Sequence, residues 1–328
     1  MNFDIGEINK RTPHLFADLA ELLVCVGYNG RIKLHKNDLA EICQSGVTSL
    51  DEIDEEFRLR DSIDCDASFR DYKDTQIDDV WAHLEYRNRT LQHLYPFYVT
   101  DSELRLKPIC DFKYGVYYLL LSCSRLRSFP SNSGVRQRWA AAFAELCKYT
   151  MRGLMPSHAD VKVFDANSTD RRSYYGTDLR EALKKLGSDL GALRVNDEEC
   201  GRASPSGDVG IDLVAIVNFD DGAATAYAVL GQCGAQQVEW PKKTLEAHPE
   251  KHRSFFQTLF SWPSVMFTPV SYRRVDGGWV SNGSASGVVL VDRSRILWLL
   301  EKENSWQHIF VEQWFLNFQN EFKNIRYE

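Results

Sequence analysis

The chain has 328 residues, a formal net charge of −7 and 44% hydrophobic residues. This composition is typical of a globular protein and too apolar for a disordered one, and the length suggests two domains or one large one. No stretch approaches the roughly 18 consecutive apolar residues of a membrane helix, so we expect no contact with a membrane. The N-terminal residues lack the basic-then-apolar pattern of a secretory signal, and we therefore expect a cytoplasmic protein.

The eight cysteines are scattered along the chain, and no two of them form a CxxC pair. This spacing argues against a structural zinc site. Most of the cysteines stand among apolar residues, as in ELLVCVGY and YYLLLSCS. We therefore expect buried, reduced thiols.

The negative charge is unevenly distributed. Residues 51–79 hold 12 Asp and Glu against 4 Lys and Arg, a net of −8, so the rest of the chain carries about +1 (−7 minus −8). A near-neutral body can still present a basic groove, so the overall sign does not exclude nucleic-acid binding. The acidic stretch is typical of a solvated face, and mimicry of DNA or contact with a basic partner is the alternative.

Residues 1–155 are expected to form a helical domain. Apolar side chains recur at helical spacing in several segments, which are residues 12–28, 36–43, 48–60, 75–97, 113–127 and 131–156. The three short helices nearest the start fit a winged-helix or helix-turn-helix unit, but a helical bundle produces the same pattern. We expect this domain to regulate, to form homo-oligomers or to bind a partner such as an ATPase.

Residues 156–328 mix helical and strand patterns. The expected elements are a helix over 176–193, strands over 210–217 and 225–233, a helix from about Lys242 to residue 260, strands over 264–272 and 286–292, and helices over 293–302 and 306–324. This order predicts an α/β (α+β) fold whose second domain is an α-β-β-α-β core with a mixed central sheet.

Two polar residues interrupt the first two of these strands. Asp212 begins an apolar strand, where an isolated carboxylate is costly unless it has a partner or binds a metal. Gln232 lies near the end of the next strand. Magnesium-dependent cleavage of a phosphodiester uses carboxylate, amide and carbonyl oxygens of this kind, with a lysine two residues further along the same strand face. In this chain the lysine position is occupied by Gly234.

The pattern has structural alternatives. Asp212 fits a turn or a cap, Gln232 fits an ordinary strand-end amide, and Asp208 fits a turn residue better than a ligand. Basic residues flank the expected core in sequence and form a phosphate-facing rim if they converge, with scattered surface charge as the equal alternative. These are Arg171, Arg172, Lys184, Lys185, Arg253, Arg273 and Arg274.

Over about residues 160–300 the chain resembles the Mrr-like branch of the PD-(D/E)XK restriction-endonuclease superfamily. The resemblance lies in the order of a helix, a strand entered by GDVGID, and a strand that ends in GQC. The resemblance implies that Asp212 and Gln232, with the carbonyl of Cys233, bind Mg²⁺ or Mn²⁺. Glu181 would match an acid that the preceding helix often carries. Because residue 234 is not lysine, Lys242 or Lys243 would take that role from further along the chain.

The same resemblance implies a magnesium-dependent DNA endonuclease, working in bacterial anti-phage defence or restriction. The missing lysine and the acidic stretch 51–79 favour the alternative, a catalytically degenerate, nuclease-like scaffold or regulatory subunit of a defence complex.

Overall fold

The structure is a computed structural model that describes residues 2–5, 12–45, 65–108, 111–129, 134–235, 240–259 and 261–327. The helix expected over 48–60 and residues 51–64 of the acidic stretch lie outside these ranges. The chain divides into two compact units. Unit 1 comprises Met1–Gln137, Val270–Val280 and Leu316–Glu328, and unit 2 comprises Arg138–Pro269 and Ser281–Phe315. Unit 2 therefore begins before residue 155, where the sequence suggested a boundary, and the chain returns to unit 1 twice.

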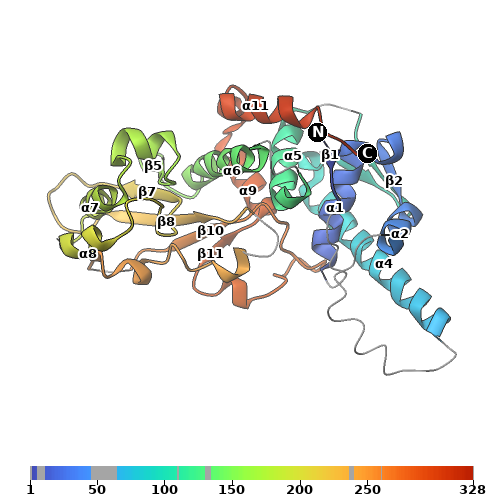
Figure 1. The fold of residues 1–328 in the computed structure, drawn as a ribbon, viewed down its shortest axis with the longest axis horizontal. Helices are drawn as coiled ribbons and strands as arrows, with labels where there is room; N and C mark the ends of the chain where they lie inside the picture. Colours follow the sequence, from blue (N-terminus) through green and yellow to red (C-terminus); the bar gives the residue numbers. More distant parts are fainter. Residues whose placement is uncertain are drawn as a thin grey trace. The chain divides into compact units, whose positions relative to one another are not determined.

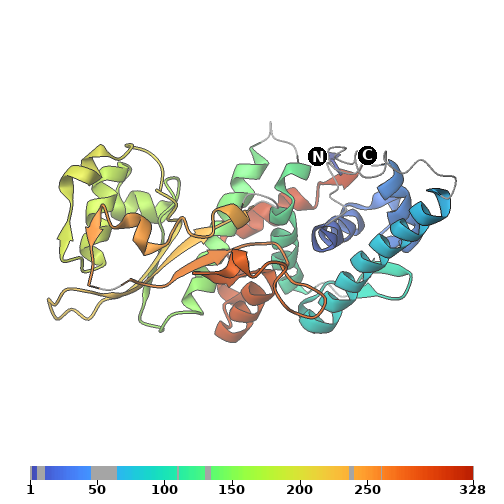
Figure 2. The ribbon, with the colours of Figure 1, turned by 90° about the horizontal axis from the view of Figure 1, so that it is seen from below.

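The helices of unit 1 follow the apolar periodicity. They are α1 (Pro13–Val26), α2 (Lys36–Ser45), α4 (Cys65–Leu91) and α5 (Phe112–Ser124). Helix α1 begins with Pro13 in its first turn and ends at Gly27, whose left-handed backbone (φ 76°) closes the helix. Helix α4 lies against α1 and α2 (Figures 1 and 2).

Unit 1 also contains a sheet that the periodicity did not predict. Strands β2 (Lys33–His35), β3 (Phe97–Val99) and β4 (Glu103–Leu106) form an antiparallel sheet in the order β2-β4-β3. Strands this short give too few alternations to be detected in a sequence. A winged helix has such a sheet beside its helices, whereas a helical bundle does not, so the sheet favours the first alternative. The winged-helix assignment itself stays a prediction. Strands β1 (Asn2–Phe3) and β12 (Arg326–Tyr327) pair in parallel near the two ends of the chain.

A buried charge network joins α1, α4 and α5. The Arg87 guanidinium lies 2.8 Å from carboxylate oxygens of both Asp18 and Glu21. Glu21 also accepts hydrogen bonds of 2.8 Å from the hydroxyls of Tyr95 and Tyr117. Because removal of one partner leaves a buried charge uncompensated, at a cost of about 3–5 kcal/mol, the network ties these helices to one another.

Unit 2 is built on a mixed sheet, as the sequence predicted, and the sheet has five strands. Its strands lie in the order β11 (Val289–Val291), β10 (Ser264–Phe267), β8 (Tyr227–Cys233), β7 (Leu213–Val217) and β5 (Asp160–Val163). Strands β5, β7 and β8 are antiparallel neighbours, and β8, β10 and β11 run parallel (Figure 1). The class is therefore α/β, and the edge strand β5 is an addition to the predicted core.

The helices of unit 2 agree with the apolar pattern of the sequence, except for a short helix over 197–202 that was not predicted and a division in two of the helix expected over 306–324. They are α6 (Val135–Arg152), which begins at the end of unit 1, α7 (Leu179–Asp189), α8 (Asp197–Arg202), α9 (Arg293–Glu303), α10 (Trp306–Phe310) and α11 (Gln313–Phe322), which continues into unit 1. Asp178 caps α7 by accepting a hydrogen bond from the Arg180 N–H. The apolar face of α7 packs into one core with side chains of β7 and β8.

The helix expected from Lys242 to residue 260 is wrong. In the described part of this segment the chain forms 3₁₀ turns at Trp240–Lys242 and Pro249–His252, and then strand β9 (Phe256–Gln257), which pairs with β6 (Arg194–Val195). Pro249 has no N–H and clashes with the preceding turn, so a regular helix cannot run through it. The crossover from β8 to β10 is therefore irregular, and it forms part of the site described below.

Within the described ranges, no helix combines the length and the apolar character needed to cross a membrane.

Candidate metal centre

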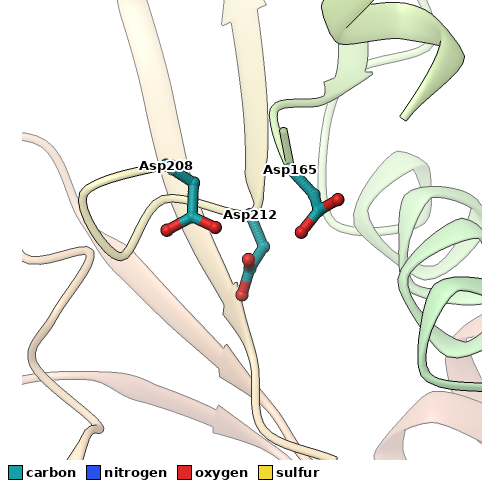
Figure 3. Close-up of side chains that lie close together, drawn as sticks. All are labelled: Asp165, Asp208 and Asp212. Carbon is teal, nitrogen blue, oxygen red and sulfur yellow. The ribbon is translucent and has the colours of Figure 1, made fainter. Parts of the chain in front are cut away.

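Three aspartates of unit 2 converge at one end of the central sheet. Asp165 follows β5, and Asp208 and Asp212 precede β7 (Figure 3). Each contributes a carboxylate oxygen to a group in which these atoms all lie within 4.8 Å of one another. Because β5 and β7 are antiparallel, the end of one strand lies beside the start of the other, and the Phe164 N–H donates to the Asp212 carbonyl at 2.6 Å.

Backbone amides hold each of the three carboxylates. The N–H of Cys233 donates to Asp212 Oδ2 at 2.7 Å. The N–H of Gly210 donates to Asp208 Oδ1 at 2.9 Å, and that of Asn167 donates to Asp165 Oδ1 at 2.8 Å. Such charge-assisted bonds are stronger than neutral ones. The carboxylates are therefore oriented before any ligand arrives, and Asp208 is a turn residue and a member of the cluster at once.

The turn that carries Asp208 and Asp212 has an unfavourable backbone conformation. Val209 has φ 54°, in the left-handed region that β-branched residues rarely adopt, and Gly210 has φ 82°. A Cβ atom at Gly210 would lie 2.7 Å from Cβ of Glu246, so a side chain does not fit there. The backbone of this turn thus approaches Glu246 closely, beside the carboxylate cluster.

The cluster concentrates negative charge in a partly buried place. Burial raises the pKa of Asp212 from its ordinary 3.8 to about 7, against the opposing effect of the Cys233 N–H, and the charges of Asp208, Asp165 and Glu246 raise it further. Burial also raises the pKa of Asp208. A cation bound among these oxygens would offset both the burial and the repulsion.

Gln232 supplies a separate indication of a ligand. Its side chain is buried, with 6% of its surface exposed, and its Nε2 donates to Glu246 Oε2 at 2.5 Å. This bond orients the amide, and Oε1 is a buried acceptor that finds no hydrogen-bond partner in the described structure. An unpaired buried carbonyl costs about 1–3 kcal/mol, whereas an amide oxygen is a suitable ligand for Mg²⁺. A cavity of about 300 Å³ is lined by residues that include Asp208, Asp212, Gln232, Cys233, Lys243 and Glu246.

The structure distinguishes the two candidate lysines. Lys243 lines this cavity, and its ammonium group forms no hydrogen bond or ion pair with any described residue. Both lysines are exposed, and Lys242 is not among the lining residues. Of the two lysines, Lys243 is the one beside the carboxylates.

The Gly234 position has no room for a side chain. A Cβ atom there would overlap Cε of Met266 and Cβ of Trp240. Both of these residues also line the cavity. Trp240, which belongs to the crossover from β8 to β10, therefore occupies space that a lysine at position 234 would need, and the same crossover brings Lys243 and Glu246 to this cavity.

The structure does not bring Glu181 to the site. Glu181 lies in the first turn of α7 with 67% of its side chain exposed, and it pairs with Lys184 at 2.9 Å. The acids that do gather around Asp212 are Asp165 and Glu246, which the sequence analysis missed. Asp165 follows the strand-like sequence VKVF, which is a weak signal, but nothing local marks Glu246, because its contact with Gln232 depends on the crossover.

Cys233 contributes through its backbone N–H, and its thiol forms a hydrogen bond with the Cys147 thiol on α6. A metal-binding role for its carbonyl stays a prediction.

Arg171 belongs to the support of the cluster and not to a phosphate-facing rim. It is fully buried, and its Nη1 donates to the carbonyls of Phe164, at 3.0 Å, and Gly207, at 3.4 Å. These carbonyls directly precede Asp165 and Asp208, so one guanidinium joins the two loops.

The residues of the expected basic rim are divided between the two units. Arg273 and Arg274 belong to unit 1, while Lys184, Lys185 and Arg253 belong to unit 2. Lys184 and Arg253 pair with acids, and Lys185 donates to the Tyr174 carbonyl.

Unit 2 has a second, larger cavity of about 490 Å³, whose lining includes Arg194, Asn196 and Arg253. None of the described residues in that lining is acidic. The smaller cavity is therefore the one suited to a divalent cation.

Comparisons of the chain with protein-family models, curated proteins and solved structures gave no match.

Proposed function

We propose that unit 2 is a metal-dependent phosphodiesterase that cleaves DNA as an endonuclease. The observation that carries this proposal is a single cavity lined by carboxylates, by Gln232 with its unpaired Oε1, and by Lys243, whose ammonium has no partner among the described residues. Oxygen ligands suit a hard divalent cation, and a nearby ammonium suits a substrate with negative charge.

The donor set fits Mg²⁺ or Mn²⁺. Asp165, Asp208, Asp212 and Gln232 would hold the ion, since they offer oxygen atoms only. Such an ion supplies two kinds of chemistry, a lower pKa for a bound water and compensation of charge on a phosphate.

The chain's own groups have separate tasks in this proposal. Lys243 lines the cavity and would bind the phosphate whose charge increases during hydrolysis. Glu246 orients Gln232 through the 2.5 Å hydrogen bond, and its carboxylate is available to accept a proton from a water in the cavity. Trp240 and Met266 form the apolar part of the wall.

The alternative function is a nuclease-like scaffold that binds a metal without cleaving DNA. The filled space at Gly234 favours it, because the lysine of the resembled family has no place on β8. Action in anti-phage defence or restriction, and an ATPase as partner, stay predictions from the resemblance.

We expect Lys243→Met to reduce cleavage of supercoiled plasmid DNA by about 100-fold, because removal of one preorganised charge-stabilising group has effects of this size. The assay uses Mg²⁺ or Mn²⁺, with EDTA as the blank. Lys242→Met is the matched control, since Lys242 lies next in sequence but outside the cavity lining, and it should retain wild-type activity within about twofold.

Equal losses of cleavage activity in the Lys243→Met and Lys242→Met variants would show that Lys243 has no specific role in cleavage. Failure of the wild-type protein to cleave, combined with a thermal shift on addition of Mn²⁺, would support the scaffold instead.

A further inference from the structure

The sheet of unit 1 has one apolar face and one cationic face. The strand register places Lys33 of β2, Arg105 of β4 and Tyr98 of β3 in one row across the sheet. Arg31 and Lys107 lie just outside the strand bounds. The contact of Lys107 with the Tyr98 ring places it on the same face as that row, and the extended backbone of Arg31 continues the alternation from Lys33. The other face carries buried side chains, namely Leu34, Leu104 and Phe97.

Positive charge dominates the outer face. Its cations are Arg31, Lys33, Arg105 and Lys107, and its acid is Glu103, which pairs with Lys33 at 3.1 Å and lies 3.6 Å from the His35 ring. The guanidinium groups of Arg31 and Arg105 are exposed and form no hydrogen bond or ion pair within the described part of the chain. At least two strong cations therefore face solvent without a counter-charge from any described residue.

Tyr98 orders two of these cations. The Arg105 guanidinium and the Lys107 ammonium lie 5.3 Å and 5.5 Å from the centre of its ring, and Lys107 also donates to the Gln92 carbonyl at 3.1 Å. Because the ring is already occupied by cations, it is poorly suited to stack on an unpaired base. The face therefore presents ordered positive charge, and its aromatic ring is poorly placed to recognise a base.

Over residues 76–91, the part of α4 whose side chains are described, the exposed side has the opposite charge. Asp78, Asp79 and Glu85 are exposed there, Asp78 pairs with Lys36, and Arg89 is the exposed cation of this part. An acidic helix is repelled by phosphates, so the sheet and not α4 is the part of unit 1 that suits a polyanion.

The geometry points to the outer face of the β2-β4-β3 sheet as a binding surface for the phosphate backbone of duplex DNA, without sequence preference. Duplex DNA carries one negative charge per about 1.7 Å of helix axis, and contacts with its phosphates need cations but no groups that read a base. This inference takes from the proposed function that DNA is the substrate. The inference adds that a surface of unit 1 binds this substrate.

The test measures binding of the full-length protein to a fluorescently labelled DNA duplex in EDTA, at several salt concentrations. Contacts from Arg31, Arg105 and Lys107 predict that log K falls with log[salt] at a slope near −2.7, since each phosphate contact contributes about 0.9. Arg105→Gln, and separately Arg31→Gln, should reduce this slope by about 0.9 and leave the melting temperature unchanged. Arg89→Gln is the matched control, which removes one exposed positive charge from α4, and it should leave the slope unaltered.

Three results would overturn the assignment. These are an equal change in the Arg89→Gln variant, unchanged slopes in both sheet variants, or tighter binding of the single strand than of its duplex. Because binding is measured without metal, a protein that binds duplex DNA through the sheet but never cleaves it would refute the proposed nuclease and retain this surface.

Discussion

Substitution Asp212→Asn is expected to abolish metal-dependent DNA cleavage and to stabilise the metal-free protein at the same time. The Asp212 carboxylate is partly buried among Asp165, Asp208 and Glu246, and it is oriented by the Cys233 N–H at 2.7 Å. Asparagine retains an acceptor for this N–H and removes the buried charge. Metal binding should fail because the ion loses an anionic ligand, and cleavage should fall by at least about 1,000-fold.

The stabilisation should depend on pH. In the folded protein the pKa of Asp212 is raised from 3.8 to about 7, so the folded state binds a proton more tightly than the unfolded state. Ionisation therefore destabilises the wild-type fold progressively between about pH 4 and pH 7, and the effect is constant above that range. The advantage of Asp212→Asn should grow over the same interval and reach up to about 4 kcal/mol, since one pKa unit corresponds to 1.36 kcal/mol.

Melting temperatures of the two proteins in EDTA, from pH 4 to pH 8, test this expectation. Added Mn²⁺ should then raise the melting temperature of the wild type and not that of the variant, because only a state that binds the ion is stabilised by it. Asp79→Asn, at an exposed position of α4, is the control and should change neither quantity. A variant that is less stable than the wild type at pH 8 would contradict the proposed strain in the cluster.

Substitution Gly234→Lys is expected to destabilise the protein by about 3 kcal/mol and not to increase cleavage. The new Cβ atom would overlap Met266 and Trp240, and overpacking of a filled core has costs of this size. Any shift of Trp240 also displaces the crossover that carries Lys243 and Glu246. A lysine at position 234, as in the resembled family, should therefore disrupt the site.

Urea denaturation and plasmid cleavage measure the two effects. Gly201→Lys is the matched control, because Gly201 lies on α8 and a Cβ atom there meets no atom within 4 Å. The control should lose less than about 1 kcal/mol, which is the usual range for exposed positions. A stable Gly234→Lys variant with greater cleavage than the wild type would show that β8 has room for the lysine and that Lys243 does not serve in its place.

The sequence by itself determined those features that depend on local periodicity. Repeating apolar residues predicted α1, α2, α5, α6 and α7, and the hydrophobic runs predicted β7 and β8, because the pattern of burial along a helix or strand is visible within a few turns. The interruption of those runs also identified Asp212 and Gln232 as residues that need a partner. Strands β2, β3 and β4 were missed because runs of three or four residues are too short to show a period.

The tertiary structure alone decided which side chains share the cavity. The register of β5 with β7 brings Asp165 to Asp212. The irregular crossover brings Glu246 to Gln232 and places Lys243, but not Lys242, in the lining of the same cavity. Glu181 was a reasonable candidate on a helix, but that helix directs it toward Lys184. These contacts join residues far apart in the chain through strand pairing and core packing, and no local pattern encodes them.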